Sequence, residues 1–209
     1  MAMPAMRPTS QSSLVVLTNQ FERAIWEELR RYAIALHNLG WIEATGGDFQ
    51  FYIDGVTHSV AKLMEAIDRE RVSIGRMLGI GVISAKKWLK LAYDSKGENL
   101  HEAIQNQEGY RDIRAPSTIN HRYINEDVPM SLVPMASLGN VWGIRVRSMT
   151  SIIRQACIVR NPNFWALGRS VERLGISNIR SEQLLSIVTE GNVDAIRMSK
   201  ESDFYSFAH

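Results

Sequence analysis

The stretch THSVAKLMEAIDRERVSIGRML, residues 57–78, decides the fold that we expect for this chain. Thr57 begins it as an N-cap residue, and the glycines at 79 and 81 follow it as helix-stopping residues. Apolar side chains between these ends recur at the spacing of one helical face: Val60, Met64, Ile67, Ile74 and Leu78. The pattern predicts the longest helix of the protein, with one face buried against its neighbours.

Helical patterns continue on both sides of this stretch. Before it, a helix is expected from Asn19, where Glu22 completes a capping box, to about Asn38. After it, we expect helices over residues 85–95, 100–105, 129–141, 149–159, 164–174 and 181–190. Residues 40–56, GWIEATGGDFQFYIDGV, break the period and predict a loop with a short extended segment. This many helices with so little strand signal predict an all-α fold.

The length of 209 residues is enough for one sizeable core. We expect a flexible lead-in over residues 1–18, a helical domain over 19–192 and a tail over 193–209. The hydrophobic fraction of 45% and the charged fraction of 22% are ordinary for a globular protein, which argues against wholesale disorder.

Charge and cysteine content narrow the classes of function. The formal charge is +2, and the basic residues are scattered, so a nucleic-acid-binding regulator is not supported. Cys157 is the only cysteine, which excludes an internal disulfide and fits a reducing, cytoplasmic setting. The N-terminal apolar run is too short for a signal-peptide core, and no run is long enough to span a bilayer. We therefore expect a cytoplasmic chain without a membrane segment.

The segment GIGVIS, residues 79–84, superficially resembles a dinucleotide-binding loop. That fingerprint requires a preceding strand, whereas a helix is predicted here, and Ser84 stands where the third glycine or alanine belongs. We interpret the glycines as a helix stop and predict no nucleotide site in the chain.

The stretch NHRYINEDVPMSLVPMASLG, residues 120–139, concentrates charge before an apolar helix. One interpretation is structural: Glu126 and Asp127 precede Pro129, and acids are favoured at a helix N-terminus. The other is functional. Arg122 would bind a substrate carboxylate with its bidentate fork, and Asp127 would orient a histidine that transfers a proton. Local pattern alone leaves both interpretations open.

A resemblance bears on this choice. The segments APSTINHRYINEDVPMSLVPMASLG (115–139) and NFWALGRSVERLGIS (163–177) resemble the C-terminal helical domain of the octopine/nopaline (opine) dehydrogenase family. Weaker similarity extends the match to about Leu36 through Ile176. The resemblance implies a multi-helix domain like the C-terminal-like helical domain of 6-phosphogluconate dehydrogenase, without the family's Rossmann domain. It also implies NAD- or NADP-dependent reductive condensation of an amino acid with a 2-oxo acid.

The resemblance also implies roles for particular residues. Arg122, with Glu126 beside it, would hold the substrate carboxylate, and Asp127 would be the acidic half of a His–Asp pair. The family's histidine falls near Arg31 or Tyr32, and neither is histidine. His37 and His121 are therefore the candidate replacements. The remaining histidines have no recognisable constellation, and none has carboxylates at metal-ligand spacing.

Two hypotheses follow. The chain is the substrate-binding half of an opine dehydrogenase-type enzyme, inactive alone, either as a truncated gene product or with a nucleotide-binding domain supplied by a separate chain. Alternatively, it is a non-catalytic binding or dimerisation module derived from that family. An apolar face is expected to be exposed unless the chain dimerises through it, and the expected partner is a second copy in a homodimer or a separate nucleotide-binding chain.

Overall fold

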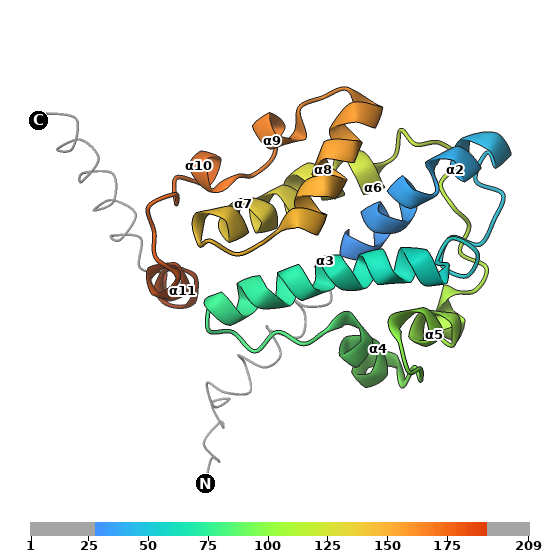
Figure 1. Ribbon diagram of the computed structural model, residues 1–209, viewed down its shortest axis with the longest axis horizontal. Helices are drawn as coiled ribbons and strands as arrows, with labels where there is room; N and C mark the ends of the chain where they lie inside the picture. The colour runs from blue at the N-terminus through green and yellow to red at the C-terminus, as the bar shows by residue number, and fades with distance from the viewer. Residues whose placement is uncertain (1–27, 192–209) are drawn as a thin grey trace, which may run out of the picture.

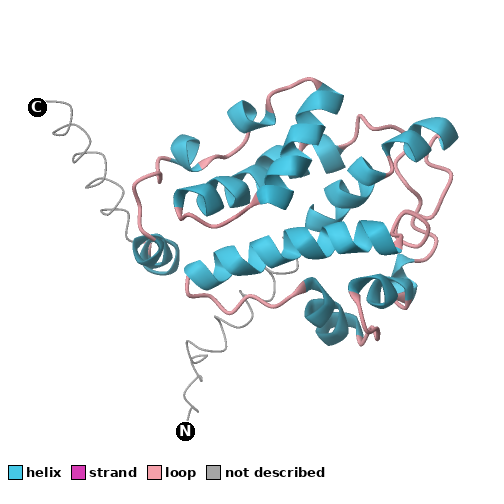
Figure 2. Ribbon diagram, in the orientation of Figure 1, coloured by secondary structure: helices cyan, strands magenta, loops and turns pink. Residues whose placement is uncertain are grey.

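The computed structural model of the chain describes residues 28–191 (Figure 1). Over these residues, helices are joined by loops, and the extended pairing is one antiparallel bridge between Gln50 and Arg114 (Figure 2). The all-α prediction is confirmed. The start of the expected helix 19–38, the lead-in and the tail lie outside the described residues.

The elements follow one another as a helical segment over 28–37, α2 (Leu39–Thr45), α3 (His58–Met77), α4 (Ala85–Tyr93), α5 (Leu100–Gln105), the 3-10 turn η1 (Glu108–Tyr110), α6 (Arg122–Asn125), the π-helical turn η2 (Val128–Leu132), α7 (Val133–Val141), α8 (Arg147–Arg160), α9 (Phe164–Leu167), α10 (Val171–Leu174) and α11 (Ser181–Glu190).

Helix α3 is the longest of the described helices, as the sequence predicted, and it runs through the middle of the fold (Figure 1). The hydroxyl of Thr57 caps it by accepting a hydrogen bond from the Val60 amide. Helices α7 and α8 pack on one side of α3 and α5 packs on another (Figure 1). From this central position, α3 contacts α5, α7 and α8.

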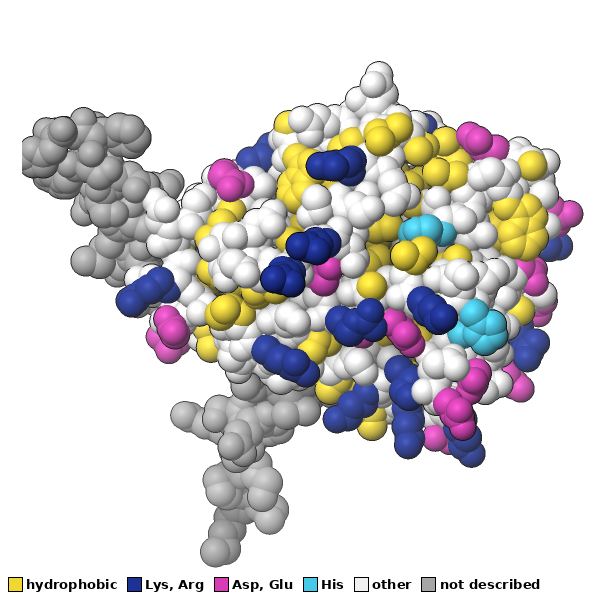
Figure 3. Space-filling view, in the orientation of Figure 1, with side chains coloured by type: hydrophobic (Ala, Val, Ile, Leu, Met, Phe, Trp, Pro, Cys, Tyr) yellow, Lys and Arg dark blue, Asp and Glu magenta, His cyan; other side chains and the backbone are white. Residues whose placement is uncertain are grey.

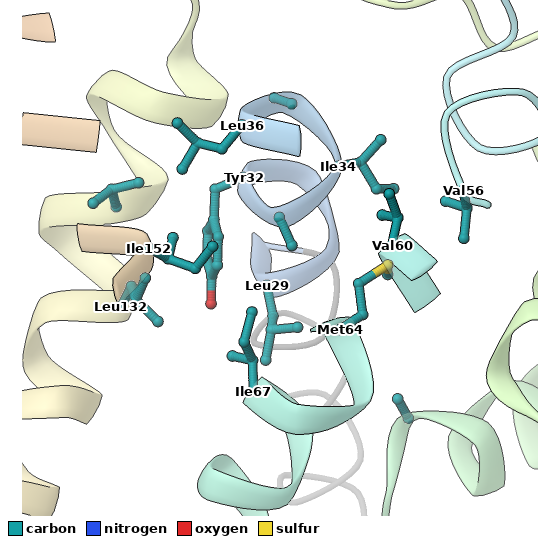
Figure 4. Close-up of a cluster of buried hydrophobic side chains, with 14 of the residues drawn as sticks. Leu29, Tyr32, Ile34, Leu36, Val56, Val60, Met64, Ile67, Leu132 and Ile152 are labelled. Carbon is teal, nitrogen blue, oxygen red and sulfur yellow. The ribbon is translucent and has the colours of Figure 1, made fainter. Parts of the chain in front are cut away.

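The core forms where the 28–37 segment meets α3, η2 and α8. Figure 4 shows Leu29 and Tyr32 facing Ile67 of α3, with Leu132 and Ile152 closing the other side. These side chains are almost fully buried, and Ala33, Ile34 and Ala35 are buried as well, so the segment is buried on more than one face. Arg31 immediately precedes Tyr32 in the chain, so the packing of Tyr32 in this core also holds the backbone of Arg31 in place.

A buried ion pair fastens α4 to α3. Asp68 accepts two hydrogen bonds from Arg71, at 2.9 and 2.7 Å, and a third from the Ala85 amide at the start of α4. Arg71 also donates to the Ile83 carbonyl at 2.6 Å. The segment 79–84 therefore connects α3 to α4, and the hydrogen bonds from α3 to Ile83 and Ala85 hold its C-terminal end in place.

Three predictions of local structure need correction. Residues 40–45 are helical in α2 rather than loop, because Ile42 is buried and the helix continues to Gly46 in left-handed conformation. An additional short helix, α6, and the turn η2 precede α7. The expected helix 164–174 is split at Gly168, where a Cβ atom would lie 2.7 Å from the Pro129 carbonyl oxygen.

Candidate functional site

The charged stretch 120–139 folds so that Asp127 turns into the protein. Its backbone is helical, its side chain makes no capping hydrogen bond, and only 4% of it is exposed. Arg31 Nε donates a hydrogen bond to Asp127 Oδ2 at 2.9 Å. Asp127 thus occupies the N-cap position of η2 without making a capping hydrogen bond, and its partner is an arginine on the first described helix.

Burial and the ion pair act in opposite directions on these two groups. Burial raises the pKa of Asp127, although the Arg31 hydrogen bond and charge oppose it. Burial also lowers the pKa of Arg31, but the hydrogen bond and charge of Asp127 outweigh that effect and the net shift is upward. A guanidinium keeps its proton throughout the physiological range, so Asp127 faces a fixed cation.

Tyr123 and His121 pack beside the ion pair. The Arg31 guanidinium carbon lies 5.4 Å from the centre of the Tyr123 ring, within the range of a cation–π contact. The His121 ring meets the Tyr123 ring edge to face, with centres 4.3 Å apart. The Tyr123 amide donates to His121 Nδ1 at 3.4 Å. Burial first, and then the charge of Arg122, lower the pKa of His121, which favours a neutral ring.

Arg122 and Glu126 lie at the two ends of α6, and both are exposed. The charge of Arg122 lowers the pKa of Asp127, and both Arg122 and Glu126 act on His121. The structure thus brings four predicted residues, His121, Arg122, Glu126 and Asp127, into one neighbourhood. Arg31 joins them from a distant part of the chain.

A polar network holds this neighbourhood against α8. Arg160 Nε donates to Asn125 Oδ1 at 3.1 Å, and its Nη2 donates to Asn120. The side-chain amide nitrogen of Asn125, Nδ2, in turn donates to Asn120 Oδ1 at 2.8 Å. These bonds join both ends of the α6 segment to the last turn of α8, so the charged residues sit on fixed backbone.

His37 is not brought to this cluster. It lies six residues after Arg31, which places it roughly 120° away around the helix axis. Its Nδ1 is 2.7 Å from the Ala33 carbonyl oxygen, and its ring lines a hollow with Leu63 of α3 and Ser151 of α8. His37 is therefore positioned by its own helix to face α3 and α8.

Two other histidines form a pair that the sequence did not reveal. The rings of His58 and His101, at the starts of α3 and α5, stack with centres 3.9 Å apart. Burial first, and then the charge of His58, lower the pKa of His101. No three His, Cys, Asp or Glu side chains within residues 28–191 are placed to hold a metal ion.

The glycine segment 79–84 does not have the setting of a dinucleotide-binding loop. A dinucleotide loop joins a strand to a helix, whereas Gly79 and Gly81 join α3 to the loop before α4.

None of the described helices is long and apolar enough to cross a bilayer.

Fold and site together define an all-helical domain whose charged α6–η2 segment closes on the first described helix through a buried Arg–Asp pair. Residues 31–160 match the family described as NAD/NADP octopine/nopaline dehydrogenase, alpha-helical domain. The chain belongs to this family, and the match covers its alpha-helical domain.

Similar proteins support this assignment. Opine dehydrogenase of Arthrobacter sp. (strain 1C) is 32% identical over 144 residues, which cover 69% of this chain and 40% of that relative. Protein ocs of Agrobacterium vitis is 31% identical, with 65% and 38% covered, and vitopine synthase of Allorhizobium ampelinum is 29% identical, with 61% and 35% covered. The chain thus spans about two fifths of the length of these relatives.

Solved structures agree on the fold. Octopine dehydrogenase with NADH and L-arginine superposes with a TM-score of 0.60 at 17% identity, covering 79% of this chain and 47% of that one. The complex with NADH and agmatine gives a TM-score of 0.61 at 16% identity, with 84% and 49% covered.

Sequence reasoning missed the role of Arg31 as the partner of Asp127. It identified position 31 only as one of two places where the resemblance predicts a histidine. The pair spans 96 residues of sequence, and no local pattern links its members. Tyr123, which packs under the Arg31 guanidinium, carried no signal of its own.

Proposed function

We propose that this domain binds the carboxylate-bearing substrates of an opine dehydrogenase-type reaction, the reductive condensation of an amino acid with a 2-oxo acid. It would act in the cytoplasm, with NAD or NADP held by a nucleotide-binding domain that lies outside the described residues, so that the helical domain alone is inactive. Membership in the family supports this function, as do relatives named opine dehydrogenase and vitopine synthase.

One observation carries the proposal: a buried carboxylate fixes an arginine beside a second, exposed arginine. Asp127 engages Nε of Arg31, whose side chain is 16% exposed. Within residues 28–191, no hydrogen bond or ion pair engages the two terminal amino groups of Arg31, which can therefore bind another acceptor. Arg122 is the first residue of α6, and its positive charge acts on Asp127. Guanidinium groups bind carboxylates with paired hydrogen bonds, so this arrangement suits a substrate carboxylate.

A second candidate function, a non-catalytic binding module, is favoured by the identity of residue 31. The resemblance implies a histidine near this position as the proton-transferring partner of Asp127, and an arginine cannot release a proton near neutral pH. Under this alternative the domain keeps carboxylate binding and lacks proton transfer. Under the first proposal, His121, which belongs to the same segment as Asp127, would supply the missing proton.

Calorimetric titration of the purified chain with pyruvate, as a simple 2-oxo acid, and with L-arginine tests the binding step. Arg122→Ala should abolish binding while thermal unfolding is unchanged, because the side chain is exposed. Arg111→Ala, an equally exposed arginine after η1, is the matched control and should bind as the parent chain does. Unchanged affinity in Arg122→Ala would refute the assignment.

Two further measurements separate the candidates. A fluorescence titration with NADH and NADPH should show no saturable binding by the chain alone, and saturation would contradict the need for a separate nucleotide-binding domain. Adding the nucleotide-binding domain of a relative should then produce substrate-dependent NADH oxidation under the first proposal. Binding without any oxidation would favour the non-catalytic module.

A further inference from the structure

Two hollows adjoin one another on the surface of α8. The first, of about 360 Å³, lies where α7 ends and α8 begins. The second, of about 260 Å³, lies between α8, α3 and the 28–37 segment. Both are lined by Arg147 and Ser151 of α8, so they meet at these two residues. We call the two hollows together the α8 groove.

The first hollow makes one half of the α8 groove strongly basic. Arg145 of the connecting loop and Arg154 of α8 line it together with Arg147, and no acid among the described residues does. The three arginines are exposed, and within residues 28–191 none of them forms an ion pair or a side-chain hydrogen bond. Figure 3 shows Lys and Arg side chains over the place where the start of α8 meets α3. A partner with carboxylates would therefore find three cations that can bind it.

The backbone around the basic half is held in place. Glu70 of α3 accepts hydrogen bonds from the Ser148 and Met149 amides at 2.7 and 2.9 Å, which ties the first turn of α8 to α3. Val146 packs so closely on α7 that a Cβ atom at Gly139 would lie 2.4 Å from its Cγ1. A groove built on fixed helices loses little conformational entropy when a partner binds.

The second hollow makes the other half of the α8 groove largely apolar. Leu63 of α3 lines it with 43% of its surface exposed, whereas Ile67 and Ile152 are almost fully buried and form its floor. The His37 imidazole is the one aromatic ring among its described lining residues. Nucleotide bases bind by stacking on aromatic rings, so this half suits an aliphatic side chain better than a base.

Uncharged polar side chains lie where the two halves meet. Ser151 lines both hollows, and its hydroxyl accepts a hydrogen bond from Gln155 Nε2 at 3.3 Å. Thr150 lines the basic side of this junction, and Gln155 lines the apolar side. Hydroxyl and amide groups both donate and accept hydrogen bonds, as the N–H and C=O groups of a peptide backbone require.

The spacing of the arginines indicates how the acids of a peptide would be spaced. Arg147 and Arg154 are seven residues apart on α8, which separates their backbones by about 10 Å. In an extended polyproline-type peptide, residues three apart share a face and lie about 9 Å from one another. Two acids with this spacing would each reach one arginine.

We propose that the α8 groove binds an acidic peptide segment of another protein. An aliphatic side chain of the segment occupies the apolar half, and carboxylates three residues apart pair with Arg147 and Arg154. None of the residues of the Arg31–Asp127 neighbourhood lines the groove. The binding of a peptide is therefore independent of the carboxylate-binding function proposed above.

Fluorescence anisotropy with a labelled peptide, Leu-Gly-Glu-Ser-Ser-Glu, tests the proposal, and a second probe with the same residues in reverse order covers the opposite direction of the chain. One of the probes should bind saturably. Exchange of its glutamates for glutamine, or of its leucine for serine, should weaken binding. Arg154→Gln should weaken binding by about fivefold through loss of one ion pair, and Leu63→Gln should do so by a similar factor through loss of apolar contact.

Matched variants outside the groove serve as controls. Arg76→Gln, at an exposed arginine of α3, and Leu91→Gln, at a leucine of α4 that is 68% exposed, should bind the probe as the parent chain does. The substituted side chains are exposed, so far-ultraviolet circular dichroism should show unchanged helix content in every variant. Arg122→Ala should also leave peptide binding intact, which keeps this test distinct from that of the carboxylate site.

The remaining outcomes would overturn the proposal. Equal loss of affinity in Arg76→Gln and Arg154→Gln, or equal binding of the probe without leucine, would mean non-specific attraction of acids. Displacement of the probe by equimolar inorganic phosphate, or by vesicles of an anionic phospholipid, would assign the groove to a different class of ligand. Absence of saturable binding by both probes would leave the groove without the proposed partner.

Discussion

The ion pair between Arg31 and Asp127 places a charged carboxylate in an interior from which water is almost excluded. Asp127 gains a fixed positive charge and one strong hydrogen bond, but burial still raises its pKa. Pairs of this kind contribute little net stability over apolar residues of similar volume. Their removal is costly only when one partner is left behind.

Arg31→Gln should therefore destabilise the fold by about 3 kcal/mol near neutral pH, because Asp127 stays buried without its cation. The loss depends on pH in a definite direction. Without Arg31 the pKa of Asp127 rises further above its unfolded value of about 4, so the folded chain takes up a proton first as pH falls. The loss of unfolding free energy should be complete at pH values above the pKa of Asp127 in the folded variant, and it should become smaller as pH falls through that pKa.

Urea unfolding at about pH 7.5 and about pH 5 checks this expectation, with the parent chain measured at both values. Arg114→Gln is the matched control, since Arg114 pairs with Asp48 at 3.0 Å but both side chains are exposed. It should change stability little at either pH. A deficit in Arg31→Gln that is the same at both pH values would show that Asp127 is not the group responsible.

At the scale of elements, the close contact between α7 and the start of α8 depends on a residue without a side chain. Gly139→Ala would place a Cβ atom 2.4 Å from Val146 Cγ1, and Val146 is itself buried. We expect a net loss of about 1–2 kcal/mol, because overpacking outweighs the gain in helix propensity. Gly40→Ala, in α2 with nothing within 4 Å, should instead stabilise by about 0.5 kcal/mol.

Thermal or urea unfolding of the two alanine variants, side by side, measures this difference. The glycines share a helical setting and differ in the space around them, so opposite signs are expected. If both variants were equally stable, the contact between Gly139 and Val146 would have to be looser than the structure shows.

The elements also show what sequence pattern predicts and where it fails. Helices α3, α4, α5, α8 and α11 begin and end within two residues of their predicted positions, because each has an apolar period with caps or stops. Helix α2 was missed because it contains Gly40, is followed by Gly46 and Gly47, and has only seven residues, whose single buried residue, Ile42, sets no period. The turn η2 widens to a π-helix between two short helices, a change without a sequence signature.

Part of the candidate site could be predicted because its residues form a local pattern in the sequence. Residues His121 to Asp127 are neighbours in the chain, so one short motif places them together. The contact with Arg31 depends on how the first described helix packs on η2, which is a tertiary property. The same applies to the α8 groove, whose lining residues come from several helices and a connecting loop.

At the scale of the whole molecule, an apolar patch borders the candidate site. Met130 of η2, Ile158 of α8 and Leu167 of α9 are exposed, and the three elements contact one another. The Met130 amide donates to the Glu126 carbonyl at 3.0 Å, which connects the patch to the charged segment. Apolar clusters beside a functional site usually mark a surface that another protein unit covers.

We expect the chain to associate with itself through this patch when no other unit covers it. Sedimentation at several concentrations should show a mass that rises above 23.7 kDa as concentration increases. Ile158→Glu, at a side chain 76% exposed, should keep the chain monomeric, because a charge would be buried at the contact without a partner. Leu91→Glu, 68% exposed on α4, matches it in exposure and should leave association unchanged. A parent chain that sediments as a monomer throughout would contradict the prediction, and the patch would then be free for a nucleotide-binding domain alone.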